Sequence, residues 1–364
     1  MRLESLPGGA CHLTYCTNIH AGESWPDIRA SLRAFLPEIK RRVSPDRAMG
    51  VGLRLSGIAA DALAGPDTLD ELAAFLERER LYLFTVNAFP YGPFHGTRVK
   101  EEVYQPDWTT PERLRFTNLA ADILAALLPD GMEGSVSTVP GTFKPLAAAP
   151  GAVEGIAERM VRHCAHLVAL ERRTGKRVAL AVEPEPCCLI ETVAETVRFW
   201  EDHLLAPPAR RLLGELSGLG EAAAEAALRR HLGVCYDVCH AAVEFEEPGA
   251  GIAVLERAGI RIAKLQLSSA LKVPLPHRDD TRLPSSRPSP PRSRWRFTHV
   301  FTVWRWTPTS WAAWPWLRPC RSIRNKARRR SSSCVARPMP RKSRASIPAL
   351  YHQHRTLSGI SAGD

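Results

Sequence analysis

Short apolar runs alternate with long amphipathic stretches over the first 270 residues. Seven runs have the length and β-branched or aromatic content of buried strands, at 11–18, 49–56, 81–87, 134–139, 177–183, 232–237 and 261–268. Between them apolar residues recur at helical spacing. Helices are predicted over 24–43, 68–78, 110–128, 153–173, 192–205 and 251–258, with a helical Ala/Leu/Arg-rich insertion at 206–230.

Residues that favour helix starts precede three of these stretches. Ser24 is expected to cap the first helix, because its hydroxyl can accept a hydrogen bond from a free backbone amide. Thr68 with Glu71, and Thr192 with Glu195, have the spacing of capping boxes. The strand and helix limits therefore rest on local chemistry as well as on periodicity.

Seven strand–helix alternations in series predict a parallel sheet covered by helices. An eighth unit would close such a sheet into a (β/α)8 TIM barrel. Neither a GxGxxG turn after the first strand nor a GxxxxGK[ST] loop is present, which disfavours a nucleotide-binding open sheet. We therefore predict a barrel over residues 1–272 with its last unit missing or replaced.

Residues 273–364 have a different composition and no helical or strand periodicity. After Leu271 there is no Glu, whereas 12 of the 30 prolines and six of the nine tryptophans fall in this stretch. A solvated tail is usually poor in Trp. Arg, Pro, Ser and Trp without Glu is what a GC-rich gene gives when read out of frame. A frameshift near codons 271–285 is the favoured interpretation, and a true basic extension is the alternative.

The net charge of +11 comes entirely from this tail. Residues 271–364 hold 20 basic and 3 acidic residues, whereas residues 1–270 hold 29 basic and 35 acidic ones. An acidic body does not favour a nucleic-acid partner. No apolar run is long enough to span a bilayer, no signal peptide is recognisable, and the nine cysteines form no disulfide framework. We expect a cytoplasmic protein with reduced thiols.

Two carboxylates and a histidine fall where strands of a parallel barrel end, and barrel active sites lie at that end. Glu183 ends the apolar run VALAV, and a carboxylate there needs a partner. Asp237 ends LGVCY, and His240 follows it on the next loop. Carboxylate and imidazole groups bind zinc or manganese. A divalent metal site of Glu183, Asp237 and His240 is predicted; the alternative is that Asp237 caps a helix and His240 packs.

Other polar residues at strand ends are weaker candidates. Arg54 could bind an anion or form a buried ion pair. The Pro/Gly-rich loop 88–98, which contains His95, is either a substrate-contact loop or a rigid connector. Cys235 and Cys239 alternate with Asp237, and buried thiols are the favoured interpretation.

Six blocks of the sequence closely resemble the metabolite traffic protein EboE group within the xylose isomerase-like barrel superfamily. They cover about residues 10–273: HLTYCTNIHAGESW, TVNAFPYGPFHGTRVKEEVYQPDW, STVPGTFKP, LAVEPEPCCLIET, LGVCYDVCHAAVEFE and KLQLSSAL. The resemblance implies that Glu183, Asp237 and His240 are metal ligands and that His95 assists catalysis. Gln266 stands where many relatives have a histidine, and a last carboxylate expected from an eighth strand is missing.

The resemblance implies a metal-dependent sugar or sugar phosphate isomerase or epimerase acting on a small metabolite, with Glu183 as ligand or base. It also implies a link to the traffic of secondary-metabolite precursors and association with other proteins of an export cluster. Two alternatives stay open: a barrel that binds a metabolite without catalysis, and an endonuclease IV-like nucleic-acid enzyme.

Overall fold

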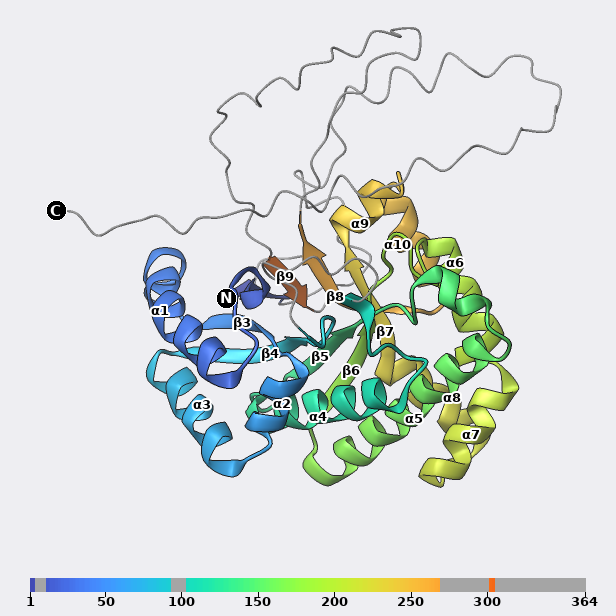
Figure 1. Cartoon of the computed structure of the whole chain (residues 1–364), viewed down its shortest axis with the longest axis horizontal. Coiled ribbons are helices and arrows are strands. Elements are labelled where there is room, and N and C mark those ends of the chain that lie inside the picture. Colours follow the sequence, from blue (N-terminus) through green and yellow to red (C-terminus); the bar gives the residue numbers. More distant parts are fainter. Residues whose placement is uncertain (4–10, 93–102, 269–300, 305–364) are drawn as a thin grey trace, which may run out of the picture.

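A computed structural model describes residues 1–3, 11–92, 103–268 and the backbone of 301–304. Its centre is one curled β-sheet, and the long helices lie outside it (Figure 1). Because apolar side chains of strands and helices meet between these two layers, the architecture is the predicted α/β barrel type. No helix among the described residues is both long and apolar enough to cross a membrane.

Seven strands of the sheet are parallel and follow one another in chain order. They are β2 (Cys11–Cys16), β3 (Met49–Arg54), β4 (Leu81–Asn87), β5 (Glu133–Thr138), β6 (Arg177–Val182), β7 (Leu232–Asp237) and β8 (Arg261–Leu267). Each corresponds to one of the seven predicted runs, so the periodicity identified every parallel strand among the described residues.

Helices connect these strands. The main ones are α1 (Trp25–Val43), α3 (Pro66–Arg78), α4 (Pro111–Leu127), α5 (Ala152–Thr174), α6 (Val193–Phe199) with the π-helical turn η4 (Trp200–Leu204), α7 (Pro207–Ser217), α8 (Glu221–His231) and α10 (Pro248–Arg257). The short helix α2 (Gly57–Leu63) and the 3-10 turns η1 (Thr17–Ile19) and η3 (Lys144–Ala148) were not predicted. The short helix α9 (Val238–Val243) was expected only under the alternative in which Asp237 caps a helix. Six or seven residues are too few for a clear helical period.

Two of the three predicted helix starts are confirmed. Ser24 and Thr192 each accept a hydrogen bond from the backbone amide three residues on, in reciprocal capping boxes. The expected box of Thr68 with Glu71 is wrong, because α3 begins two residues earlier at Pro66. The Thr68 hydroxyl instead donates to the carbonyl of Ala62 at 2.8 Å. Proline at the first helical position outweighed the capping signal.

The edges of the first and seventh parallel strands, β2 and β8, are both paired in the structure. Strand β9 (Phe301–Trp304) pairs antiparallel with both β2 and β8 and closes the sheet between them (Figure 1). Strand β1 (Arg2–Leu3) adds an antiparallel pair to β2. Four residues of the tail thus occupy the position of the eighth barrel strand, but they run antiparallel to its neighbours.

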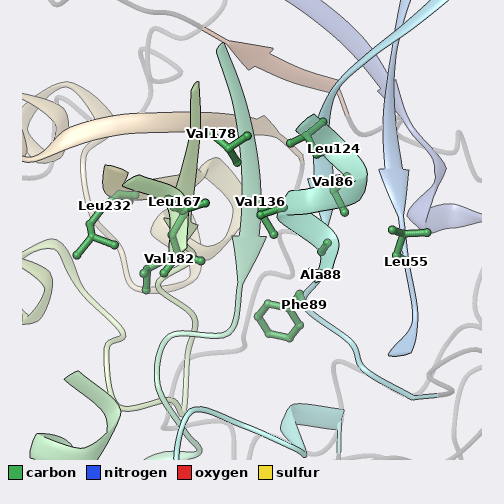
Figure 2. Packing of buried hydrophobic residues seen from close by; sticks show 14 of the residues in the cluster. Leu55, Val86, Ala88, Phe89, Leu124, Val136, Leu167, Val178, Val182 and Leu232 are labelled. Atoms are coloured by element: carbon green, nitrogen blue, oxygen red, sulfur yellow. The ribbon is translucent and has the colours of Figure 1, made fainter. Parts of the chain in front are cut away.

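The main core lies between the strands and the helices. Val86, Val136 and Val178 on the strands belong to one buried cluster with Leu124 of α4 and Leu167 of α5 (Figure 2). Each fully buried side chain of this size contributes roughly 1.5–3 kcal/mol. This layer fixes the strand ends from which the polar side chains described below project.

Small and polar side chains occupy part of the barrel interior. A Cβ atom on Gly52 would lie 3.0 Å from Cys16 Sγ, so glycine permits close approach there. Thr85 and Ser135 share a hydrogen bond of 2.9 Å across neighbouring strands. Ala179, Ala181, Cys235 and Ala263 form a separate small cluster. Small side chains leave room for the few long polar ones.

Candidate functional site

The carboxyl ends of β6, β7 and β8 bring together the acidic residues that the sequence singled out. Glu183 directly follows β6, and Asp237 is the last residue of β7. Both are 4% exposed. Parallel strands end at one rim of the barrel, which explains why residues 54 positions apart in the sequence are neighbours there.

Gln266 of β8 lies between the two carboxylates. Its Nε2 donates to Glu183 Oε1 at 3.1 Å and also donates to Asp237 Oδ2. Asp237 and Gln266 are register partners in the β7–β8 pairing, and Gln266 is 6% exposed. One amide therefore satisfies one oxygen of each acid in the place between them.

Asp237 also caps α9. Its Oδ1 accepts a hydrogen bond from the backbone amide of Cys239 at 2.8 Å and another from the Ser268 hydroxyl. Burial alone would raise the pKa of Asp237, but His240, Ser268, Cys239 and Gln266 outweigh burial and lower it. Asp237 therefore caps α9 through Oδ1, as the capping alternative expects, while Oδ2 is bound by Gln266. The metal role of Asp237 stays a prediction.

His240 is held beside the acids by the following turn. Its Nδ1 lies 3.0 Å from the carbonyl oxygen of Pro184 and 3.9 Å from Glu183 Oε1. Burial alone would lower its pKa, but Asp237, Glu185 and Glu183 outweigh burial and raise the pKa to about 9. The bond to Pro184 fixes the ring and directs Nε2 away from that carbonyl, as is common for histidines that bind metals.

Glu183 keeps one oxygen without a partner. Oε2 is buried and has no hydrogen-bond partner among the described residues. Burial raises the pKa of this carboxyl, and Lys264 counteracts that shift more than any other side chain does. An unsatisfied buried carboxylate oxygen is costly, so this is the point in the barrel where an additional positive or hydrogen-donating group fits.

Among the described residues, the group of metal-binding atoms that lie close together differs from the predicted set, because it contains Cys239 and not Glu183. One ligand atom each from Asp237, Cys239 and His240 lie within 4.8 Å of one another. Cys239 is half-buried, and burial is the main reason that its thiol pKa is raised to about 12. The metal-binding atoms at this rim are therefore carboxylate oxygens and an imidazole nitrogen, and a protonated thiol lies beside them.

Aromatic rings line the same end of the barrel. Tyr104 stacks on Phe143 with ring centroids 6.1 Å apart and meets Phe89 edge-on at 6.0 Å. Figure 2 shows Phe89 just beyond the end of its strand. The Tyr104 hydroxyl donates to Glu185 Oε1 at 3.3 Å. An apolar wall next to carboxylates suits a ligand that presents both C–H and O–H groups.

The other sequence candidates have mixed outcomes. Of the two alternatives for Arg54, the structure has the ion pair: its Nη2 lies 2.6 Å from Glu23 Oε2. Arg54 also donates to the carbonyls of Gly22 and Gly92. His95 and much of the loop 88–98 lie outside the described residues, so their roles stay predictions. Cys235 is a buried thiol, as expected.

Lys264 is the residue that the sequence analysis missed. It is 1% exposed on β8, and its Nζ donates to Ser137 Oγ of β5 at 2.9 Å. Since β5 and β8 are not neighbours in the sheet, this bond crosses the barrel interior. A signal existed: Lys264 stands two positions before Gln266 in an apolar run, and alternate residues of a strand share a face.

No protein-family model matches the chain, and no curated protein matches its sequence. Solved structures with a similar backbone include the probable 3-DHS dehydratase AsbF from Bacillus anthracis, with 12% identity and a TM-score of 0.38 over 68% of this chain and 70% of that one. Another is an L-ribulose 3-epimerase, with 11% identity and a TM-score of 0.38 over 66% of this chain and 65% of that one. A third is the IolI protein with a bound zinc atom, with 16% identity and a TM-score of 0.31 over 57% of this chain and 58% of that one. Likeness of this extent says nothing about activity.

Proposed function

We propose that the β6–β8 rim binds a divalent cation through Glu183, Asp237 and His240, and that the protein is an isomerase or epimerase of a small polyhydroxylated metabolite. The observation that supports this most is the pair of buried carboxylates whose unsatisfied oxygen, Glu183 Oε2, lies in a polar interior. Oxygen and imidazole donors suit zinc or manganese. The bound ion would polarise a carbonyl–hydroxyl pair of the substrate.

The chain's own residues would supply the remaining functions. Glu183, whose pKa burial raises, is suited to move a proton between neighbouring carbons of the substrate. His240 is oriented by its bond to Pro184. Tyr104 and Phe143 offer a stacking wall for the carbon face of the substrate. The resemblance to the EboE group supports His95 as a residue that assists catalysis.

One observation favours a second candidate, a barrel that binds a metabolite without converting it. Gln266 Nε2 already lies between the two acids and donates to both, so a cation has to replace those hydrogen bonds. The resemblance to the EboE group supports a role of this kind in the traffic of secondary-metabolite precursors in the cytoplasm, together with other proteins of an export cluster and without nucleic acid.

Proton exchange separates the two candidates. The full chain is incubated with Mn²⁺ and a panel of ketoses, aldoses and their phosphates in D₂O, and deuterium at the carbon next to the carbonyl is followed by NMR. An isomerase or epimerase incorporates deuterium, and Glu183→Gln abolishes this while Glu201→Gln, an exposed control, does not. Saturable sugar binding without exchange supports the binding protein, and DNA cleavage would support neither.

A further inference from the structure

Lys264 is a buried cation inside the barrel that no part of the proposed function uses. It is 1% exposed, and its Nζ donates a hydrogen bond to the neutral hydroxyl of Ser137. Lysine is almost never fully buried without a compensating charge. The Ser137 hydroxyl accepts one hydrogen bond from the ammonium group but does not neutralise its charge. The compensation has to come from acidic groups nearby.

The sequence of β8 identifies those acidic groups. Lys264 and Gln266 are alternate residues on the barrel-facing side of β8, and Gln266 binds both Glu183 and Asp237. Cys235, the register partner of Lys264, stands two residues before Asp237 on the same face of β7. Lys264 therefore lies one layer below the two carboxylates in the barrel.

The electrostatics of the three residues agree with this placement. Burial alone would lower the pKa of Lys264, but Cys235, Glu183, Cys16 and Asp237 together outweigh burial and raise it. Among side chains, Lys264 has the largest effect on Glu183. His240 belongs to α9, which directly follows β7, and its Nδ1 lies 3.9 Å from Glu183 Oε1.

We infer that Lys264 is the resident countercharge of the Glu183–Asp237 pair, a positioning residue that stabilises the empty site and competes with any cation bound there. This rests on the proposed function only for the cation. Two ionised carboxylates without Lys264 repel one another in a low-dielectric interior, whereas a divalent ion placed between them would meet less repulsion. Loss of the lysine charge should therefore lower the stability of the metal-free protein and strengthen its binding of a cation.

A double-mutant cycle in chelator tests the inference without any metal. Urea midpoints are measured with EDTA for the full-length wild type, Lys264→Gln, Glu183→Gln and the double variant. We expect Lys264→Gln to lower the midpoint and Glu183→Gln to restore part of that loss, because the second change removes the uncompensated charge. Ser137→Ala, which deletes the hydrogen bond but keeps both charges, should show no such coupling to Glu183→Gln. Additive midpoints overturn the inference.

A Lys264→Gln chain that does not fold still decides the question. Recovery of folded protein in the double variant then supports the countercharge, and failure of the double variant overturns it. With folded Lys264→Gln, Mn²⁺ titration should give a dissociation constant at least about tenfold below that of wild type. Equal constants overturn the inference. If neither protein binds Mn²⁺, the proposed function fails, and the cycle in chelator alone decides the role of Lys264.

Discussion

Asp237 on β7 and Gln266 on β8 are register partners, and the Gln266 amide donates to Asp237 Oδ2. The same Nε2 reaches Glu183 Oε1 at 3.1 Å. A neutral amide thus donates hydrogen bonds to two buried acids at the rim of the barrel. The stability of the metal-free rim therefore depends on Gln266.

Gln266→Leu should lower the free energy of unfolding by about 2–4 kcal/mol in the presence of EDTA, because two buried carboxylate oxygens lose their donor. Urea unfolding followed by circular dichroism measures this. Gln105→Leu is the matched control: its amide donates to one carboxylate oxygen, of Asp107, at 2.7 Å on a half-buried side chain. A loss no larger than that of the control would contradict the bridging role.

Arg113 should be far more important for stability than its neighbour Arg115. Arg113 is fully buried and donates to the carbonyls of Ala88, Phe89 and Pro106. Arg113→Met is expected to cost about 3–5 kcal/mol, since it leaves buried carbonyls without donors. Arg115→Met removes an exposed pair with Asp61 and a hydrogen bond with Tyr91, and should cost less than about 1 kcal/mol. Comparable urea midpoints for the two variants would refute this.

His163 should make the protein sensitive to acid. It is fully buried, Nδ1 lies 2.6 Å from Asn118 Oδ1, and burial lowers its pKa well below the ordinary 6.5. Below pH 6.5 the unfolded chain therefore binds a proton that the folded chain does not, and stability falls as the pH falls. His163→Gln should reduce this slope by about 1.4 kcal/mol per pH unit between pH 6 and pH 5. Parallel stability curves for both proteins would exclude His163 as the cause.

The tail gives a prediction at the level of the gene. A frameshift remains our explanation for the Glu-free composition after Leu271, and β9 runs antiparallel where a barrel would have its eighth parallel strand. Sequencing of the DNA and the transcript should reveal another frame that encodes an apolar strand ending in Glu. A confirmed uninterrupted frame for residues 271–364 would contradict the frameshift.

The parallel strands could be predicted because burial on both faces gives continuous apolar runs of strand length. Glu183 and Asp237 could be predicted for a related reason: each is a carboxylate at the end of such a run. The bond that Gln266 makes to both acids could not, because it depends on the register of β8 against β7. Lys264 was missed because a single lysine in an apolar run is ambiguous until its opposite neighbour, Ser137 across the barrel, is known.

The most direct test of the central claim is the metal content of the rim. The full chain is stripped with chelator and titrated with Mn²⁺ and Zn²⁺ by calorimetry, beside Glu183→Gln, Asp237→Asn and the exposed control Glu201→Gln. We predict about one equivalent bound by wild type and control, and at least about a hundredfold weaker binding by the two rim variants. Less than one equivalent in wild type, or rim variants that bind as wild type does, would contradict the account.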